Sequence, residues 1–538
     1  MRTSLRSARR SIVAVAAACV LVGAMGFPAQ ASGQAGSADP TVVETAAGQV
    51  RGVVTEDRRT FAGIPYAAPP VGELRWQPPQ PAASWQGVRD ATSPGSRCPQ
   101  AGASGTSEDC LFLNVTTPPV SAGTHLPVMV WIHGGSWTTG AGSNYGATRL
   151  LQSGAGPVLL VTLNYRLGAL GFLAHPALDQ GEAKSGSFAF ADQTAALRWV
   201  RTNIAAFGGD PDNVTLFGES AGGDSVCAQL AAPASAGLFE RAIIQSASCI
   251  PSSWWNTQEE SERLGLEAAA SLGCSDPATA AACLRKVPAD DLVKAMSASQ
   301  IALTPTYGGD VLPEEPGVAV STGHFNRVPV MHTGTLDEHR LFVAAREVAT
   351  GKPLTEADYA TEVRAEFGDD AARLLARYPT SAYGSPSLAM AAMFTDGTWS
   401  CDGLRTEQTL ARFVPTFAGE FADRDAPRYP GTESVSFPLG AAHASELQYL
   451  FDGPSFPDRL NAAQAQLSQE MARYWVRFAT TGNPSGTGSP IWPGSAPSSV
   501  HAQSFTPGAD GIRLVDLKAE HQCGFWATYD TTSAEKKP

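Results

Sequence analysis

The residues best placed to do chemistry surround Ser220, in the run FGESAGG at positions 217–223. An apolar, β-prone run precedes it at 214–217, and small, helix-compatible residues follow at 221–230. The G-x-S-x-G spacing predicts a serine lifted on a sharp turn from strand to helix, because glycine accepts the backbone angles and close packing that this turn requires. The hydroxyl is then exposed beside the positive end of the new helix. We therefore expect Ser220 to act as a nucleophile.

A serine hydroxyl is a weak nucleophile at neutral pH, so it needs a base and an acid that orients the base. The acid is expected at the end of a later strand, and the apolar run at 330–335 leads directly into Asp337 and Glu338. We choose Glu338 as the acid and keep Asp337 as its rival.

Three histidines follow Glu338 at some distance, namely His443, His501 and His521. His521 lies beside a cysteine in the tail, and His501 lies in a Ser- and Pro-rich stretch that is typical of a surface. His443 has small neighbours that would let its loop approach the serine, so we choose His443 as the base. The order serine, acid, histidine is that of the α/β-hydrolase fold.

The tetrahedral intermediate of acyl transfer needs N–H donors for its oxyanion. An apolar strand-like run ends at 132 and continues into HGGSW at 133–137, a Gly-rich turn that frees backbone N–H groups to face a pocket. We assign oxyanion donation to the N–H groups of Gly135, Ser136 and Ala221. His133 is expected to brace this turn rather than to act as the base.

These residues need a scaffold, and the chain alternates strand-like and helix-like runs, separated by loops rich in Gly and Pro. The alternation predicts an α/β fold with a mostly parallel central sheet flanked by helices, with inserted loops and helices around a site at the carboxyl ends of the strands. A single domain is expected from 32 to 538. The predicted strands are 126–133, 158–163, 214–219, 242–246, 328–333 and 414–421, and the clearest helices are 190–207 and 467–480.

The first 31 residues have the pattern of a secretory signal peptide, with four Arg, an apolar run at 12–27 and the small-residue site AQA at 29–31. That run is too short for a membrane anchor, and no other run is long enough to span a bilayer. Removing the four Arg from the 38 Lys and Arg of the chain leaves 34, against 51 Asp and Glu. This charge disfavours nucleic acid and anionic membrane as partners. We expect a secreted protein that acts on a small molecule, with a monomer favoured.

Eight cysteines remain besides Cys19 in the leader, an even number that agrees with export. Six of them could form three bridges, and the last two form a fourth bridge or stay as buried thiols. The three pairs are Cys98 with Cys110, Cys274 with Cys283, and Cys401 with Cys523, and the last two are Cys227 and Cys249. Because no C-x-x-C motif or Cys/His cluster occurs, a zinc site is not expected. The serine chemistry expected at Ser220 requires neither a metal nor a cofactor.

With these motifs, the chain resembles the type-B carboxylesterase family, which includes bacterial p-nitrobenzyl-type esterases, animal carboxylesterases and cholinesterases. The resemblance covers nearly all of the chain after the leader, and its motifs occur in the family's order. They are FAGIPY at 61–66, LRW at 74–76, EDCLFLNV at 108–115, NYR at 164–166, DQ at 192–193, FGGDP at 207–211 and GESAGG at 218–223.

The resemblance implies a serine carboxylesterase that hydrolyses carboxylic esters with Ser220, Glu338 and His443 as its triad and with the oxyanion donors given above. It also supports the three disulfide pairs. Three further residues are implied to be buried beside the site in supporting roles: Glu219, Glu446 and Ser246, the last of which is expected to hydrogen-bond near the acid.

The chain departs from the family pattern at three places. Ser136 replaces the third glycine of the oxyanion turn, and His339 replaces a glycine after the acid, in a turn one residue shorter than usual. The loop between Cys98 and Cys110 is short and has no aromatic residue, so the cation–π surface of a choline site is missing. The same shortness argues against the long lid of related fungal lipases.

Two other functions remain as alternatives. A lipase or polyester-type hydrolase would use the same triad on larger substrates. A non-catalytic adhesion or ligand-binding protein of this fold would typically lack a triad residue, whereas this chain has all three. Two roles remain for Trp254 and Trp255: they line the acyl pocket, or they pack in the core or at the surface.

Overall fold

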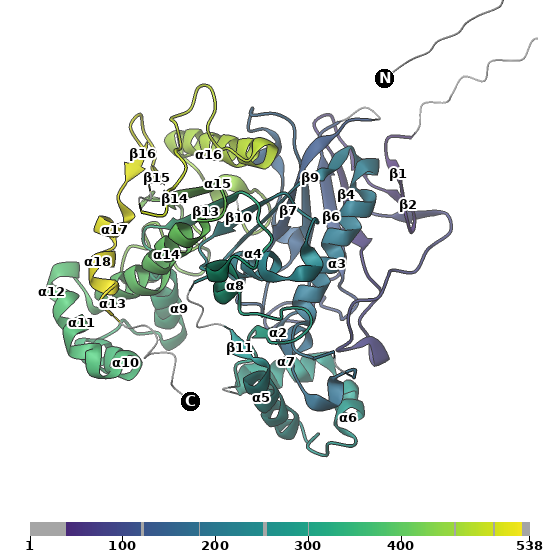
Figure 1. Ribbon diagram of the computed structural model, residues 1–538, viewed down its shortest axis with the longest axis horizontal. Helices are drawn as coiled ribbons and strands as arrows, with labels where there is room; N and C mark the ends of the chain where they lie inside the picture. The colour runs from purple at the N-terminus through teal and green to yellow at the C-terminus, as the bar shows by residue number, and fades with distance from the viewer. Residues whose placement is uncertain are drawn as a thin grey trace, which may run out of the picture. The chain divides into compact units, whose positions relative to one another are not determined.

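An eleven-stranded sheet forms the centre of the structure, as the alternating apolar runs predict (Figure 1). The computed structural model describes residues 39–119, 123–181, 183–250, 255–299, 301–456, 459–498 and 501–529. The predicted signal peptide at 1–31 lies outside the described residues. From Pro40 onward the chain belongs to one compact unit.

The strands from β15 to β8 are parallel, and antiparallel pairs lie toward both edges of the sheet. The predicted α/β class with a mostly parallel sheet is therefore confirmed. In spatial order the strands are β16 (Ile512–Val515), β15 (Ala502–Phe505), β14 (Thr416–Phe421), β13 (Val330–Thr335), β10 (Arg241–Gln245), β9 (Gly209–Glu219), β7 (Leu126–Ile132), β8 (Leu159–Leu163), β6 (Phe112–Thr117), β4 (Arg59–Pro65) and β3 (Val53–Val54).

Helices cover both faces of this sheet, because successive side chains of a strand point to opposite faces and both sets are apolar. Trp131 and Phe217 belong to one core, with α1 (Thr148–Leu151), α15 (Leu447–Leu450) and α16 (Ala462–Thr481). Val130 and Leu216 belong to the other, with α3 (Phe188–Asn203), α4 (Ala221–Ala231), α8 (Pro316–Thr322) and α14 (Cys401–Leu410).

Two further helical groups have hydrophobic cores of their own and lie apart from each other in Figure 1. One contains α9 (Arg340–Thr350), α10 (Glu356–Phe367), α11 (Ala371–Arg377), α12 (Thr380–Tyr383), α13 (Pro386–Phe394) and α18 (Cys523–Trp526). Helix α17 (Leu517–Glu520) packs instead through Leu517 on Ala418 of β14 and Ala502 of β15. The other contains α2 (Gly168–Phe172), α5 (Gln258–Ser271), α6 (Ala280–Lys286) and α7 (Ala289–Ala298). Short strands form two small sheets, β1 (Val42–Thr45) with β2 (Gly48–Arg51) and β5 (Val88–Asp90), and β11 (Asn256–Thr257) with β12 (Thr306–Tyr307).

The observed elements differ from the predicted bounds mainly at their beginnings. Helix α16 begins before the predicted residue 467, because Asn461 and Gln464 form a capping box. Strand β9 begins at Gly209 rather than at 214, since Gly209 pairs with Leu126 of β7 and the extra residues before Val214 form an irregularity in β9. The helix predicted at 190–207 is α3 followed by a 3₁₀ turn.

Four disulfides join the eight described cysteines. Three are the pairs suggested by the sequence, Cys98–Cys110, Cys274–Cys283 and Cys401–Cys523. The fourth joins Cys227 in α4 to Cys249 after β10, so these two residues form a bridge rather than two thiols.

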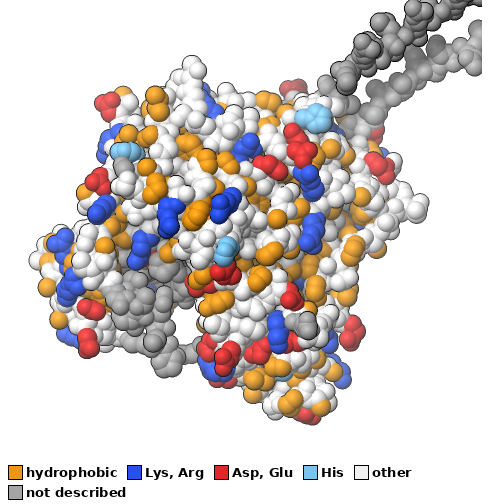
Figure 2. Space-filling model, viewed as in Figure 1, with side chains coloured by type: hydrophobic (Ala, Val, Ile, Leu, Met, Phe, Trp, Pro, Cys, Tyr) orange, Lys and Arg blue, Asp and Glu red, His pale blue; other side chains and the backbone are white. Residues whose placement is uncertain are grey.

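The surface mixes charges of both signs. Figure 2 shows Lys and Arg side chains scattered among Asp, Glu and hydrophobic side chains on one face of the molecule. Within the described ranges, no helix is both long and apolar enough to cross a membrane. The same residues contain no group of three or more His, Cys, Asp or Glu side chains suited to hold a metal ion.

His521, one of the three candidate bases, is buried away from Ser220 and joins distant parts of the chain. Its Nδ1 lies 2.9 Å from Asp396 Oδ1, and its Nε2 lies 2.5 Å from Glu420 Oε1 in β14. Burial alone would lower the pKa of His521, but the charge of Glu420 and the hydrogen bonds to both carboxylates outweigh burial and raise this pKa to about 10. The cluster therefore holds a charged imidazolium at neutral pH.

We expect His521→Gln to lower the free energy of unfolding near neutral pH by about 3 kcal/mol, because two buried carboxylates lose their cation. Because the pKa of His521 is raised in the folded state, its imidazolium stabilises the fold fully below pH 6.5, the ordinary pKa value. This stabilisation of the fold is lost as the pH rises through about 10. Urea unfolding measures the difference between wild type and variant, which should shrink toward pH 10. A difference that stays constant over this range would contradict the assignment, and His501→Gln, at an exposed histidine, is the control.

Candidate active site

Ser220 lies on the turn between β9 and α4, with a φ of 57° and a ψ of −130°. L residues rarely adopt this conformation, so surrounding contacts must hold it. The Ser220 N–H donates to the Gln245 carbonyl oxygen of β10 at 2.9 Å. A Cβ at Gly222 would lie 2.1 Å from the Ile132 carbonyl oxygen of β7, so only glycine allows α4 to approach the sheet this closely. The turn therefore presents Ser220 at the carboxyl end of β9.

Ser220 lines a cavity of about 550 Å³ together with His443. The described walls combine aromatic and aliphatic side chains with uncharged polar ones, and Glu219 is the one acidic residue that lines them. The apolar side chains include Tyr145, Leu341, Phe342, Tyr429 and Phe456. Such a lining suits an uncharged organic ligand.

The predicted oxyanion turn follows β7 and lines the same cavity. Gly135, Ser136 and Trp137 have consecutive positive φ values of 107°, 53° and 54°. The Gly135 carbonyl oxygen accepts from the N–H groups of Thr138 and Thr139, each at 3.0 Å, which fixes the turn. Neither Gly135 nor Ser136 donates its N–H to another described residue. These two groups and the N–H of Ala221, the first residue of α4, are thus available near Ser220.

His133 is buried behind this turn and does not line the cavity. Its ring stacks on that of Tyr165 with 4.4 Å between centroids, and the Tyr165 hydroxyl donates to the His133 carbonyl oxygen at 2.7 Å. Burial lowers the pKa of His133 to about 4, so the ring is neutral at physiological pH. These contacts agree with a bracing role.

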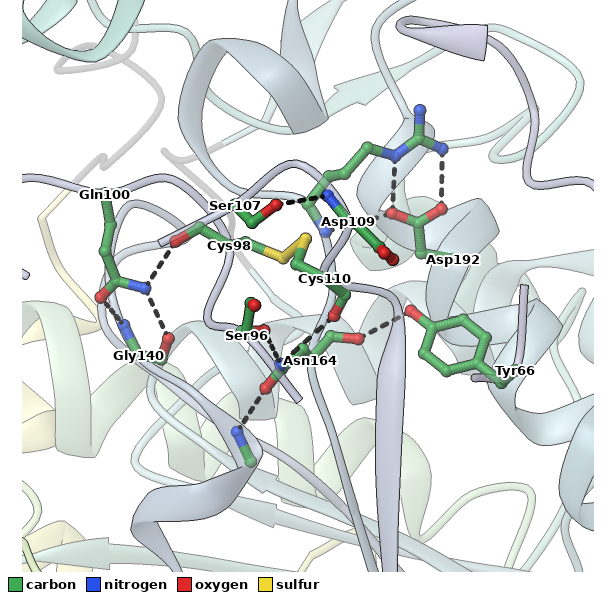
Figure 3. Close-up of a disulfide and its surroundings, with 12 residues drawn as sticks. Tyr66, Ser96, Cys98, Gln100, Ser107, Asp109, Cys110, Gly140, Asn164 and Asp192 are labelled. Atoms are coloured by element: carbon green, nitrogen blue, oxygen red, sulfur yellow. Dashed lines mark hydrogen bonds and ion pairs between the residues drawn. A yellow bond between two sulfur atoms is a disulfide. The ribbon is translucent and has the colours of Figure 1, made fainter. Parts of the chain in front are cut away.

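A second set of contacts joins the segment that follows the oxyanion turn to the Cys98–Cys110 loop (Figure 3). The Gln100 side-chain amide donates to the Gly140 carbonyl oxygen at 2.8 Å and accepts from the Gly140 N–H at 2.9 Å. Asn164 accepts from the Gly142 N–H at 2.9 Å and donates to two backbone carbonyl oxygens at or beside the loop. Gln100 was not predicted from its sequence motif, although the short loop that carries it was an available signal.

Glu338 and His443, predicted from different loops, are in direct contact. His443 Nδ1 lies 2.6 Å from Glu338 Oε2, and Glu338 Oε1 accepts from the Thr335 N–H at 2.7 Å. Both side chains are buried. The His443 N–H also donates to the Glu338 carbonyl oxygen at 3.2 Å. Both oxygens of the Glu338 carboxylate therefore have a hydrogen-bond partner, and one of them fixes the Nδ1 side of the imidazole.

Asp337, the rival acid, contacts the backbone of the histidine loop instead. Its carboxylate accepts from Arg424 at 2.9 and 3.0 Å, lies 2.8 Å from Arg340 Nη2, and accepts from the Ala441 N–H at 3.1 Å. The Asp337 N–H donates to the Ala441 carbonyl oxygen at 2.9 Å. Asp337 therefore anchors the segment that precedes His443.

Three more carboxyl groups are buried near the imidazole. Glu219 Oε1 lies 3.1 Å from His443 Nε2, and Glu446 Oε1 accepts from Gln245 Nε2 at 3.0 Å. Burial and the nearby charges of Glu338 and Asp224 raise the pKa of Glu219 well above its ordinary value. Burial and Glu219 raise the pKa of Glu446 to about 8, and burial raises that of Asp224 to about 8. Glu446 and Asp224 therefore retain protons at neutral pH, and the raised pKa of Glu219 shifts this group toward its protonated form.

Ser246 differs from its expected bonding. Its Oγ has no hydrogen-bond partner among the described residues, and Ser246 lines a small cavity of about 30 Å³ together with Glu338 and Thr335. The expected hydrogen bond near the acid is therefore absent from the described contacts, because the side chain faces this cavity.

Trp255 packs in the core rather than along the Ser220 cavity, with its ring 6.3 Å from Trp137 and 5.6 Å from Phe190. Trp254 lies outside the described residues.

Aromatic residues surround His443, and their roles were not predicted from the sequence. Its ring centroid lies 4.7 Å from that of Trp399 and 5.1 Å from that of Phe342. Trp399 Nε1 donates to His339 Nδ1 at 3.3 Å, and His339 stacks on Phe342 and Phe394. Burial and the charge of His443 lower the pKa of His339 to about 3, so His339 is a neutral acceptor.

Comparison with known proteins gives the same family throughout. A model of the carboxylesterase family matches residues 39–526. The chain is 36% identical over 490 residues to para-nitrobenzyl esterase of Bacillus subtilis (strain 168), covering 84% of this chain and 92% of that protein. It is 35% identical over 497 residues to fumonisin B1 esterase of Sphingopyxis macrogoltabida, covering 88% and 87%. It is 32% identical over 530 residues to liver carboxylesterase 1 of Oryctolagus cuniculus, covering 84% and 88%.

Solved structures agree with these relatives. A PNB esterase structure covers 91% of this chain and all of its own, with a TM-score of 0.75 and 33% identity. A thermophilic PNB esterase covers the same share of this chain, with a TM-score of 0.76 and 31% identity.

We expect Glu338→Gln to lower kcat/KM by about a thousandfold or more, because the amide cannot hold the imidazole tautomer that accepts the serine proton. Asp337→Asn should cost less than about a hundredfold, since it weakens an anchor of the loop and leaves the imidazole partner in place. Steady-state kinetics with p-nitrophenyl acetate compares the two variants, with circular dichroism as the check on folding. A folded Asp337→Asn that is as impaired as Glu338→Gln would make Asp337 the better candidate for the acid.

We expect Glu219→Gln to keep kcat/KM within about tenfold of wild type near neutral pH, because the amide resembles the protonated carboxyl. The raised pKa also predicts a stability difference: wild type loses stability as the pH rises above the ordinary carboxyl pKa, and the variant lacks this loss. Activity and thermal melting from pH 5 to 9 measure both effects. A large fall in activity with unchanged melting behaviour would show that Glu219 acts as a charged group.

Proposed function

The chain belongs to the carboxylesterase family and is a carboxylic-ester hydrolase, and on that premise we propose that it works through an acyl-enzyme on Ser220. The observation that carries the proposal is the cavity that Ser220, His443, Gly135 and Ser136 line together. Glu338 supports it by its 2.6 Å contact with His443 Nδ1. No metal or cofactor is part of the proposed reaction.

In the proposed reaction, His443 takes the Ser220 proton as the serine oxygen attacks the ester carbonyl carbon. Glu338 holds the imidazole in the required tautomer and stabilises the imidazolium that forms. The N–H groups of Gly135, Ser136 and Ala221 stabilise the developing oxyanion. The imidazolium then protonates the leaving alcohol.

Water attacks the acyl-enzyme in the second half of the reaction, with His443 again as the base and then as the acid. This step releases the carboxylic acid and returns the proton to Ser220. The raised pKa values of Glu219 and Glu446 support this cycle, because a protonated carboxyl adds no negative charge beside the imidazole.

The proposed substrates are small uncharged esters. The aromatic and aliphatic lining of the Ser220 cavity favours them, and Glu219, the one acidic residue that lines it, has a raised pKa from burial and nearby charges. The Cys98–Cys110 loop has no aromatic residue, so a cation–π site for a choline ester is not part of the proposal.

Secretion is the second part of the proposal. The leader at 1–31 has the charge and hydropathy pattern of a signal peptide. Four disulfides support an oxidising environment for the folded chain.

A fluorophosphonate probe tests the proposal, because it reacts with an activated serine without requiring a particular substrate. We expect wild type to label at Ser220 and the folded variants Ser220→Ala and His443→Ala to lose labelling. His521→Gln should still label and serves as the matched histidine control. Labelling of folded Ser220→Ala, or a folded wild type that does not label, would contradict the proposed mechanism.

A further inference from the structure

A small cavity of about 30 Å³ lies beside Glu338 and is named here the Glu338 chamber. It lies at the carboxyl ends of β10, β13 and β14, which are neighbours in the central sheet (Figure 1). Its other walls include residues of α14 and of the π-helical turn Thr395–Ser400. None of its described lining residues also lines the Ser220 cavity, so the two spaces are separate.

Four polar side-chain atoms of residues that line the Glu338 chamber have no hydrogen-bond partner in the described part of the chain. They are Ser246 Oγ, Thr335 Oγ1, Glu407 Oε2 and Glu420 Oε2. The four residues are only 1% to 3% exposed, so bulk solvent does not hydrogen-bond these atoms. Burying a polar atom without a hydrogen bond is costly. Four such atoms around one cavity therefore point to a bound ligand that satisfies them.

The two carboxyl groups already have a proton-bearing partner at their other oxygen. Glu420 Oε1 lies 2.5 Å from Nε2 of His521, which is charged at neutral pH. His332 Nε2 donates to the Ala247 carbonyl oxygen at 2.7 Å, because a carbonyl oxygen can only accept. The 2.9 Å contact of His332 Nδ1 with Glu407 Oε1 needs a second proton, so this pair is neutral overall. The ligand therefore needs no positive charge and must only form hydrogen bonds.

Water fits this requirement. The hydroxyl groups of Ser246 and Thr335 can donate or accept, whereas an ionised carboxylate oxygen can only accept, so the ligand must be able to do both. A buried water needs about 10–15 Å³ of cavity volume, so the Glu338 chamber has room for about two. A Cβ built at Gly334 would meet only Glu338 Oε1 within 4 Å, at 3.4 Å. Open space therefore lies directly beside this oxygen of Glu338.

We propose that the Glu338 chamber binds about two water molecules, which bridge the four unpartnered atoms to the Glu338 carboxylate. The consequence for catalysis rests on the proposed function, in which Glu338 stabilises the imidazolium of His443. A water that donates to Glu338 favours its ionised form and holds its orientation. Glu407 and Glu420 are then positioning residues that act on Glu338 through this water.

Substitutions at Gly334 test the proposal without removing any polar group. Gly334→Ala places a methyl group in the space beside Glu338 Oε1, and Gly334→Ser places there a hydroxyl group that can replace the hydrogen bond of the water. Gly494→Ala is the matched control, because a Cβ there meets no atom closer than 3.7 Å and Gly494 lines neither the Glu338 chamber nor the Ser220 cavity. Thr335→Val, which removes a hydroxyl group and keeps the side-chain shape, repeats the test if Gly334→Ala does not fold.

Crystal structures of wild type and the variants locate ordered water in the Glu338 chamber. We expect about two waters within hydrogen-bond distance of the four atoms in wild type, and fewer in Gly334→Ala. Crystals soaked in thallium acetate show whether a monovalent cation binds instead. A wild-type Glu338 chamber without ordered water, or with a thallium peak, would overturn the water site.

Steady-state kinetics with p-nitrophenyl acetate measures the consequence for catalysis. We expect Gly334→Ala, or Thr335→Val in its place, to lower kcat by at least about tenfold with KM unchanged, since a charged group loses a hydrogen bond. Gly334→Ser should recover most of this loss, and Gly494→Ala should match wild type. Unchanged kcat in Gly334→Ala, or a Gly334→Ser variant that is equally impaired, would overturn the role of the water. The crystals report the water site without turnover, so this site and the proposed function can fail independently.

Discussion

Ser220 has a backbone conformation that an isolated chain would leave, so the site depends on close backbone packing where β7, β9 and β10 end. Gly222 packs against the Ile132 carbonyl of β7, and the Gln245 carbonyl of β10 accepts the Ser220 N–H. The oxyanion turn continues from the same end of β7. The register of three parallel strands therefore sets the position of the proposed nucleophile relative to the groups that would stabilise its product.

Burial then decides the charge state of the groups around the imidazole. Glu338 has hydrogen-bond partners for both oxygens, whereas burial raises the pKa of Glu219, Glu446 and Asp224. Because Glu338 and His443 are buried, the interaction between the carboxylate and the imidazolium of the proposed reaction is stronger than it would be in water. The scarcity of charged side chains in the Ser220 cavity likewise suits neutral esters.

The sequence was sufficient to predict the parallel strands from β14 to β8, because each is a short apolar run bounded by turn residues, but not β15, whose run AQSF is largely polar. Motif spacing was sufficient to choose Ser220, Glu338 and His443. It did not predict Gln100, Trp399 or the capping box at Asn461, because single polar or aromatic residues have no periodic signal and gain their roles only through distant contacts. Asp337 and Glu338 are adjacent in sequence, and only the tertiary contacts separate an anchor of the loop from a partner of the imidazole.

The most direct test of this account is to quench the reaction during turnover of p-nitrophenyl acetate and to measure the mass of the protein. The account predicts a transient covalent acetyl group, mapped by peptide digestion to the segment that contains Ser220, with a burst of p-nitrophenol of matching amplitude when deacylation is the slower step. An acetyl group located on another residue would contradict nucleophilic attack by Ser220. A pre-steady-state release of p-nitrophenol that is faster than deacylation but leaves no covalent adduct on the protein would contradict it too.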